Sequence, residues 1–291
     1  MLKYKAYAKI NLFLDVISRR PDGFHNIKSV MHSLSLCDDL TFAVSPSDYT
    51  DISVKIKGND SLPTDENNLV FKAAVLYLEA IGKTAKIEIS LEKNIPSSAG
   101  LGGGSSDAAA TLCALNDSFD KKLSTDELLS LGERLGSDVP FCILGGTALC
   151  EGRGEVLSKI PFNASVHFVI AIGSGSVSTP KAYAALDARY SAFDGTVKTG
   201  GEEIFPKFLE NILSGKSPSE LLFNVFEETV CEDIPEVAYI KSRLVSLGAL
   251  GALMSGSGPS VFGIFPDEDT AKCAASSLSS EGIRAYVARS V

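Results

Sequence analysis

The chain has 291 residues, 45% of them hydrophobic and 22% charged, and a formal net charge of -9. This length predicts one large domain or two of ordinary size, and either can bury a substantial core. The negative charge argues against wholesale binding to a nucleic-acid backbone, although it is compatible with a local basic site for a small anionic ligand. No apolar run approaches the roughly 20 residues of a membrane-spanning helix, and we expect no signal peptide before the first strand.

The cysteine and histidine content narrows the chemistry further. None of the six cysteines forms a CxxC pair, which favours reduced thiols in a cytoplasmic protein over a disulfide framework or a zinc site. Only three histidines occur, so a histidine-rich metal site is excluded. No histidine lies in an activating motif near a cysteine, and we therefore expect no catalytic thiol.

Residues 4–17 alternate between two sets of side chains, which predicts a strand. Lys9, Asn11, Phe13 and Asp15 share one of its faces. From the sequence alone, that face is either a solvated strand surface or part of a binding site.

A turn signal, Arg-Pro-Asp-Gly at residues 20–23, ends this strand and leads directly into Phe24 and His25. These two residues are either ordinary strand-start residues, or a ring that stacks on a ligand and its hydrogen-bonding neighbour. Residues 27–57 then predict two or three strands, with polar breaks at Asp38–Asp39 and at residues 45–50.

The stretch Pro96–Asp107 has the sequence PSSAGLGGGSSD and lies between a predicted strand at residues 86–91 and a predicted helix that reaches about Leu115. Glycines let backbone N–H groups approach a ligand closely, and the N-terminus of a helix attracts anions. We therefore predict a phosphate site here, with Ser105 or Ser106 as the helix cap. The alternative is a flexible surface loop. The stretch is not a P-loop, because no Gly-Lys-Ser/Thr follows at the required spacing.

Local end signals place two more helices. Asp65–Asn68 precede a periodic apolar run over residues 69–81, which Gly82 ends. Ser124–Glu127 form a capping-box pattern, and the helix that it begins ends at Gly136. Both helices belong to the part of the chain around the glycine-rich stretch.

Asp138 directly follows this last helix, in the sequence Gly-Ser-Asp-Val-Pro. It either caps a short helix begun by Pro140, or it presents a carboxylate to a substrate hydroxyl. The local sequence favours the cap.

The second half alternates between strands and helices and closes with strand, helix, strand, which suggests a ferredoxin-like α+β arrangement. We place the domain boundary near residue 160, giving domains of residues 1–160 and 161–291. Residues 192–202 are predicted to be a mobile loop. The predicted strands are 147–150, 166–172, 261–265 and 285–288, and the predicted helices are about 178–189, 203–213, 218–231, 235–247 and 267–278.

Three stretches, taken in order, resemble a known set of motifs. They are AKINL at residues 8–12, the glycine-rich stretch at 96–106, and MSGSGPS at 254–260. Together they resemble the three motifs of the galactokinase, homoserine kinase, mevalonate kinase and phosphomevalonate kinase (GHMP) superfamily, over the whole chain. The resemblance implies an α+β fold with an N-terminal domain like ribosomal protein S5 domain 2, a C-terminal ferredoxin-like domain and an active site in the cleft between them.

Within this superfamily, the chain is most similar to the branch whose alcohol substrate, a methylerythritol, carries a cytidine diphosphate in the non-mevalonate isoprenoid pathway. Phe24 departs from the tyrosine of many relatives and loses a hydroxyl contact, and residues 97–99 carry less glycine than is usual. The stretches that support this branch are Lys9–Leu12, Arg20–His25, Glu66–Leu69, Gly102–Gly104, Gly136–Pro140 and Asn224–Glu227.

The resemblance also implies roles for individual residues of an ATP- and Mg²⁺-dependent kinase. Asp138 would accept the proton of the attacking hydroxyl, and Lys9 would lie near it and neutralise developing charge. The metal would take a ligand from Ser105 or Ser106. The implied ATP-binding residues are Asn67, Asn68, Lys93, Pro96, Ser97, Ser98, Ala99, Gly100, Leu101, Gly102, Gly103, Gly104, Ser105 and Ser106. The implied substrate-binding residues are Asn11, Phe24, His25, Tyr183, Gly256 and Ser257.

Two other functions stay open from the sequence. The chain is alternatively a homoserine or mevalonate-type kinase of the same superfamily, or a non-catalytic nucleotide-binding module. Phe24 and His25 argue against the first alternative, since a cytidine-bearing substrate has the more obvious need of them. The net charge and the presence of Lys9 and Asp138 argue against the second. We expect a small-molecule substrate, no nucleic-acid or membrane partner, and a monomer or weak homodimer in the cytoplasm.

Overall fold

The computed structural model describes residues 1–162, 166–190 and 199–291. This chain divides into two compact units, which we describe separately. The first unit consists of Met1–Ala8, Leu36–Ser97 and Gly102–Gly145, and the second of Lys9–Ser35, Ser98–Leu101 and Gly146–Val291. The two long strands β1 (Leu2–Arg19) and β2 (His25–Pro46) contribute residues to both units. The boundary near residue 160 stays a prediction.

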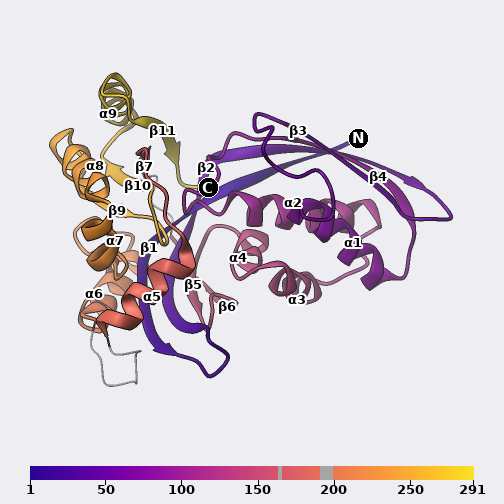
Figure 1. The fold of residues 1–291 in the computed structure, drawn as a ribbon, viewed down its shortest axis with the longest axis horizontal. Helices are drawn as coiled ribbons and strands as arrows, with labels where there is room; N and C mark the ends of the chain where they lie inside the picture. Colours follow the sequence, from indigo (N-terminus) through magenta and orange to yellow (C-terminus); the bar gives the residue numbers. More distant parts are fainter. Residues whose placement is uncertain (163–165, 191–198) are drawn as a thin grey trace. The chain divides into compact units, whose positions relative to one another are not determined.

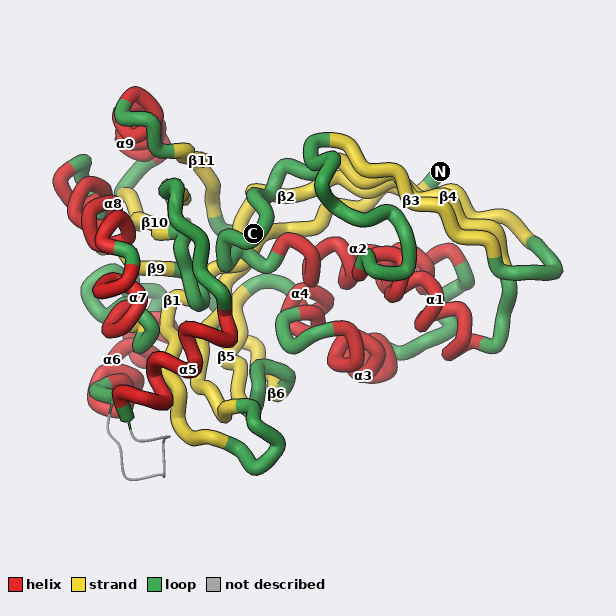
Figure 2. The backbone as a smooth tube through the Cα atoms, viewed as in Figure 1, coloured by secondary structure: helices red, strands yellow, loops and turns green. Residues whose placement is uncertain are grey.

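In the first unit, helices pack on one face of a sheet (Figures 1 and 2). The second half of β2 pairs antiparallel with β4, which pairs parallel with β3. The elements of this unit, besides its parts of β1 and β2, are β3 (Asp51–Lys57), β4 (Ala85–Glu92), α1 (Leu69–Ile81), α2 (Gly103–Ser118), α3 (Thr125–Leu135) and α4 (Val139–Leu144).

The alternation of β4 explains how this core forms. Ala85, Ile87, Ile89 and Leu91 are buried, and every second residue between them is exposed. A strand with period two buries one face, and the small residues Ala108–Ala110 of α2 let the helix backbone approach that face closely. The core thus holds α2, and with it the glycine-rich N-terminus of the helix, against the sheet.

In the second unit, β5 pairs with the first half of β2, and β8 pairs parallel with β1. Its other sheet is antiparallel in the order β11-β7-β10-β9, which is the strand order of a ferredoxin-like unit. The elements are β5 (Thr147–Glu151), β6 (Val156–Lys159), β7 (His167–Ile172), β8 (Phe223–Asn224), β9 (Gly251–Met254), β10 (Val261–Phe265), β11 (Arg284–Arg289), α5 (Thr179–Arg189), α6 (Gly201–Leu213), α7 (Glu227–Asp233), α8 (Pro235–Ser246) and α9 (Glu268–Ser280).

Several helix ends are confirmed together with the interactions that define them. Asn68 caps α1 by accepting the Val70 N–H, and Gly82 ends that helix in the left-handed conformation with a φ of 60°. The capping box of Ser124 and Glu127 is complete. These ends were predictable because each is determined by a few neighbouring residues.

Two predictions in the first unit are wrong. Asp38–Asp39 do not break β2, which runs through both residues. The Asp38 side chain is buried within the strand, where its carboxylate accepts the N–H groups of Asn94 and Ile95. Neither Ser105 nor Ser106 caps α2, which begins earlier, after Gly102, whose φ is 70°. Because the N-cap residue is a glycine, it has no side chain that could bond the N–H groups of the first turn. The helix therefore begins without a side-chain cap.

In the second unit, one prediction is wrong and another falls largely on residues that the structure does not describe. The helix at 218–231 is wrong, since residues 223–224 form β8 and α7 starts only at Glu227. The Val225 N–H donates to the Leu14 carbonyl at 3.0 Å, which keeps this segment extended beside β1. The predicted loop at 192–202 lies largely outside the described residues, and Gly201 already begins α6.

Candidate active site

The N-terminus of α2 presents unpaired backbone donors. The first helical hydrogen bond runs from the Ser106 N–H to the Gly102 carbonyl at 2.9 Å. Gly102 has no side chain to cap the N–H groups of residues 103–105. A Cβ on Gly103 would lie 3.1 Å from the Ile95 side chain and 3.3 Å from Lys93 Nζ. Donors aligned at the positive end of a 16-residue helix suit a phosphate.

The middle of the glycine-rich stretch packs against the second glycine loop, Ser255–Ser260. Gly100 has a φ of 75°, and a Cβ there would collide with the carbonyl oxygen of Ser255. The Ser255 hydroxyl donates to the Gly100 carbonyl at 3.2 Å, and the Ser260 hydroxyl donates to the Ala99 carbonyl. The two glycine motifs, about 155 residues apart in sequence, are therefore in direct backbone contact.

Lys9 and Asn11 lie together beneath the second glycine loop. Both are buried, and Lys9 Nζ donates to Asn11 Oδ1 at 2.9 Å. A Cβ on Gly256 would lie 3.5 Å from Lys9 Nζ, while the Lys9 N–H donates to the Leu101 carbonyl at 2.9 Å. The interpretation of this strand face as a solvated surface is therefore wrong: it is buried beside both glycine loops.

Asp138 occupies the N-cap position of α4, but its side chain makes no capping hydrogen bond there. Its backbone is helical, with a φ of -84° and a ψ of -15°, whereas a capping residue normally has extended geometry. The residue is half-buried in the first unit. The carboxylate is therefore not used to start α4, although the sequence favoured that use.

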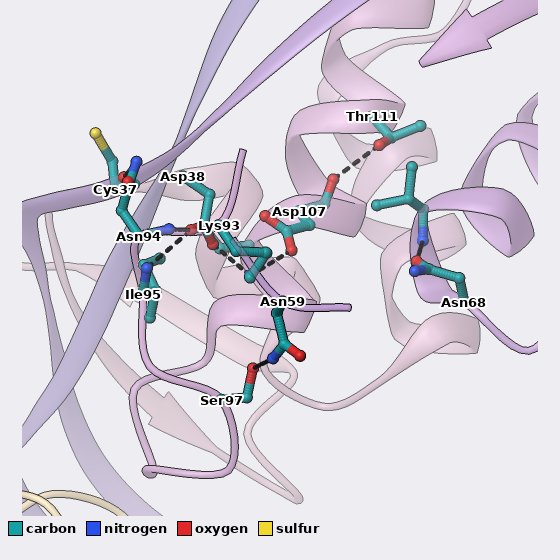
Figure 3. A network of polar contacts seen from close by, with 12 residues as sticks. Cys37, Asp38, Asn59, Asn68, Lys93, Asn94, Ile95, Ser97, Asp107 and Thr111 are labelled. Atoms are coloured by element: carbon teal, nitrogen blue, oxygen red, sulfur yellow. Dashed lines mark hydrogen bonds and ion pairs between the residues drawn. The ribbon is translucent and has the colours of Figure 1, made fainter. Parts of the chain in front are cut away.

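Lys93 lies in a buried ionic network (Figure 3). Its Nζ is 2.7 Å from Asp107 Oδ2 and also contacts Asp38 Oδ2, and all three side chains are at most 5% exposed. The sequence implied that Lys93 binds ATP. Its ammonium group instead joins β2 to the first turns of α2, so a direct role at the adenine stays a prediction.

Asp107 is the unusual member of this network. Burial raises its pKa to about 7, the Lys93 ammonium opposes the rise, and the Asp38 carboxylate adds to it. Its Oδ1 is buried and has no hydrogen-bond partner in the described structure. One ammonium between two buried carboxylates leaves a net negative charge, which a proton on Asp107 would remove.

Other residues implied at the ATP lie nearby in the first unit. Asn68 is occupied by its cap and by the Pro63 carbonyl, to which its Nδ2 donates at 2.7 Å. Asn67 is exposed and is bonded to Asp65. The Ser97 hydroxyl accepts from Asn59 at 3.0 Å, as Figure 3 shows.

Three aromatic residues implied to bind a base lie in the second unit, and two of them stack on each other. The His25 and Tyr183 rings are stacked, with centroids 4.7 Å apart and an interplanar angle of 21°. Phe24 is 53% exposed, and the Arg153 guanidinium lies 5.2 Å from its ring centroid. The Ser257 hydroxyl lies 2.8 Å from that of Thr179, the first residue of α5, which also carries Tyr183.

Three polar residues of these clusters were missed as site residues. Asp187 Oδ1 lies 2.7 Å from His25 Nε2 and orients that ring. Asp38 was assigned to a strand break, although it is in phase with the buried residues Leu40 and Phe42, and this alternation was the available signal. Asp107 stood at the end of the glycine-rich stretch with no role assigned to it.

Two further features do not occur in the described residues. No three histidine, cysteine, aspartate or glutamate side chains gather as a metal site within these ranges. In the same residues, no helix has the length and apolar character needed to cross a membrane.

Family models match both halves of the chain. The model "GHMP kinases N terminal domain" matches residues 68–146, and "GHMP kinases C terminal" matches residues 210–284. The first match includes the glycine-rich stretch and Asp138, and the second includes the second glycine loop.

Individual proteins match over nearly the full length. The 4-diphosphocytidyl-2-C-methyl-D-erythritol kinase of Lachnoclostridium phytofermentans is 42% identical over 94% of this chain and 90% of its own. A crystal structure of 4-(cytidine 5'-diphospho)-2C-methyl-D-erythritol kinase aligns with a TM-score of 0.79 at 35% identity, covering 99% of this chain and 98% of that one. Homoserine kinase from Cytophaga hutchinsonii aligns with a TM-score of 0.76 over 99% of this chain and 94% of its own, but its 22% identity speaks for the fold alone. These matches confirm the expected two-domain α+β fold.

Proposed function

Since the chain belongs to the GHMP kinase family, we propose that it transfers the γ-phosphoryl group of ATP to the 2-hydroxyl of 4-diphosphocytidyl-2-C-methyl-D-erythritol. This reaction serves the non-mevalonate route to isoprenoid precursors. The observation that carries the proposal is the 42% identity with a kinase of that name over almost the whole chain. Kinases of similar fold that act on homoserine or mevalonate reach only 22% identity or less among the structures compared.

The glycine-rich stretch supports the use of ATP. A Cβ at Gly103 would be pressed against Ile95 and Lys93, so this glycine is needed for the first turn of α2 to lie where it does, and no side chain of Gly102 caps that turn. Backbone N–H groups there would hold the phosphates and orient the γ-phosphoryl group. Phosphoryl transfer requires mainly such positioning and charge stabilisation.

Lys9 and Asp138 would act on the transferring group. Asp138 would take the proton of the attacking hydroxyl, and its carboxylate is not used as a helix cap. Lys9 would offset the negative charge that develops in the transition state. Its buried position, with Nζ held by Asn11, supplies the preorganisation that this role needs.

A serine at the start of α2 would help to hold Mg²⁺, which would supply positive charge to offset that of the nucleotide phosphates. The two serines considered as ligands differ in their present contacts. The Ser106 hydroxyl donates to the Tyr7 carbonyl at 2.6 Å, whereas Ser105 lies half-buried one residue earlier. Ser105 is therefore the better candidate ligand.

The cytidine end of the substrate would lie at the aromatic residues Phe24, His25 and Tyr183, of which the last two stack on each other. Aromatic side chains stack on a base with about 1–3 kcal/mol per base. The Asp187 carboxylate holds His25, so the imidazole would meet the base in a fixed orientation. A substrate without a base would gain nothing from these residues.

A coupled assay of ADP release tests the proposal. The purified chain is given ATP and Mg²⁺ with the cytidylated methylerythritol, and separately with homoserine or mevalonate. We expect turnover with the first alcohol alone, and a phosphorylated product confirmed by mass. Turnover with homoserine or mevalonate would assign a different kinase of this family, and nucleotide binding without turnover on any alcohol would favour a non-catalytic module.

A further inference from the structure

Asn224 opens the stretch Asn224–Glu227, which contributed to the family resemblance without an assigned role. It lies in β8, opposite Leu14 of β1, and is only 4% exposed. A buried amide must find partners for its two donors and its acceptor. Its partners therefore show what the residue holds in place.

All three partners are backbone groups. Asn224 Nδ2 donates to the carbonyl of Met254 at 2.7 Å and to that of Gly256 at 2.8 Å. Its Oδ1 accepts the Phe226 N–H at 3.0 Å. The two carbonyls flank Ser255, so one amide group spans the first turn of the second glycine loop. Aspartate has the same shape but no donors, and serine has one.

Glu227 binds the same segment at the residue before the loop. Its Oε1 accepts the Met254 N–H at 2.9 Å, while its Oε2 pairs with Lys241. Met254 thus has both backbone groups bound by side chains of this four-residue stretch. The stretch acts as a clamp at the point where β9 leads into the loop.

The clamped loop in turn touches the groups assigned to phosphoryl transfer. The Ser255 carbonyl lies where a Cβ of Gly100 would be, and the Ser255 hydroxyl bonds the Gly100 carbonyl. Gly256 lies against the polar atoms of Lys9 and Asn11, at 3.5 and 3.6 Å from a Cβ built on it. A shift of this loop would therefore change the contacts of both Lys9 and Gly100 of the glycine-rich stretch.

We propose that Asn224 is a positioning residue for phosphoryl transfer, acting through the Met254–Gly256 backbone on Lys9 and on the loop at residues 98–101. The role rests on the proposed kinase function. It follows from geometry, because one buried side chain holds the two carbonyls on either side of Ser255. Displacing catalytic groups by about 1 Å lowers rates on the order of 100-fold.

The first test is a kinetic comparison of Asn224→Asp with Asn116→Asp. Asn116 is a matched control, because it is buried and its amide also bonds backbone groups, the carbonyl and the N–H of Leu123, at the C-terminal end of α2 and away from the glycine-rich N-terminus of that helix. We expect Asn224→Asp to lower kcat by about 30- to 100-fold while KM for ATP changes little. Asn116→Asp should lower the melting temperature with kcat near the wild-type value. Equal loss of kcat in both variants would overturn the proposal.

Asn224→Ala guards against a variant that does not fold, because it buries no carboxylate. It should reproduce the loss of kcat, and a wild-type kcat in this variant would overturn the positioning role. Hydrogen exchange without any substrate gives an independent readout. The backbone amides of residues 98–101 and 254–260 should exchange faster in the Asn224 variants than in the wild type, and at the wild-type rate in Asn116→Asp. Wild-type exchange rates in all variants would refute the clamp.

These measurements separate the two proposals. If the wild-type chain does not phosphorylate the cytidylated alcohol, the proposed function fails, whereas the exchange data still decide whether Asn224 holds the two loops. If the wild-type chain is active and both Asn224 variants keep its kcat, only the positioning role fails.

Discussion

Lys93 and Asp107 form an ion pair of 2.7 Å in which neither side chain is more than 5% exposed. Asp38 binds the same ammonium from β2. This arrangement fastens the glycine-rich N-terminus of α2 to the sheet, because Lys93 follows directly on β4 and Asp107 lies in the second turn of the helix. Lys93, for which the family resemblance implied a contact with ATP, is thus paired with two buried carboxylates of the protein, those of Asp38 and Asp107.

Replacing Lys93 by Met should be strongly destabilising. Removing the cation leaves two buried carboxylates unpaired, and breaking a buried pair in this way costs about 3–5 kcal/mol. Urea unfolding of Lys93→Met against wild type measures the loss in the free energy of unfolding. Lys57→Met is the control, since it removes an exposed pair with Glu92 and should change stability little. Equal stability of the two variants would contradict the structural role of Lys93.

Asp107 makes stability depend on pH. Its pKa is raised to about 7 in the folded chain, whereas an unfolded aspartate titrates near 3.8. The folded state therefore holds a proton that the unfolded state has lost, and this contribution to stability decreases as pH rises from about 4 to 7. Asp107→Asn should remove that dependence, so its stability relative to wild type improves between pH 5 and pH 8. The neighbouring exposed Asp39→Asn is the control, and parallel pH curves for Asp107→Asn and wild type would exclude the effect.

What was predictable from the sequence depended on how local its cause was. The ends of α1 and α3 depend on Asn68, Gly82 and Ser124, each acting on residues within one turn. The ordered glycine motifs gave the family, because they are contiguous in the chain. Local alternation could have shown that Asp38 is buried, but such rules could not predict its partners, since Lys93, Asn94 and Ile95 are more than 50 residues away.

The same limit applies to Asn224 and to the helix expected around it. Its apolar neighbours have helical spacing, but the parallel pairing of β8 with β1 overrides that preference. Its hydrogen bonds reach Met254 and Gly256, 30 and 32 residues further on. Sequence patterns therefore identified which stretches matter, whereas the side chains that hold them required the three-dimensional structure.

Asp138→Ala should leave the fold intact and reduce turnover by at least ~100-fold, the usual contribution of a general base. The fold should survive because the side chain makes no capping bond in α4. Asp267→Ala is the informative control, as Asp267 does cap its helix by accepting the Thr270 N–H at 2.7 Å. That variant should lose stability and keep its turnover. Near-normal turnover in Asp138→Ala would rule out the base assignment.

Lys9→Met should lower the rate more than it weakens ATP binding. The ammonium is placed to stabilise charge that develops during transfer, so its loss affects the transition state more than the bound nucleotide. Steady-state kcat and a direct measurement of ATP affinity separate the two effects. Lys5→Met, which removes an exposed lysine of the same strand, should change neither. A loss confined to ATP affinity would contradict the charge role.

His32 should make the chain sensitive to acid. It is buried, with Nδ1 2.7 Å from the Thr147 hydroxyl and Nε2 3.0 Å from that of Ser290. Burial lowers the pKa of His32 to about 4, whereas a histidine in the unfolded chain titrates near 6.5. Between these two pH values the unfolded state binds a proton that the folded state does not bind. Stability should therefore fall as pH drops from 6.5 to 4, by ~3 kcal/mol at most for this residue.

The matching variant is His32→Asn, compared with wild type by urea unfolding at steps between pH 7 and pH 4. Asp107 acts with the opposite sign over part of this range, so the difference between variant and wild type is the quantity to follow. That difference should shrink steadily as pH falls, because only the wild type carries the cost of an unprotonated buried imidazole. His167→Asn, at a half-buried histidine of β7, should keep the acid sensitivity of the wild type. A difference that stays constant with pH would show that the contacts of His32 matter only as packing and not through its proton.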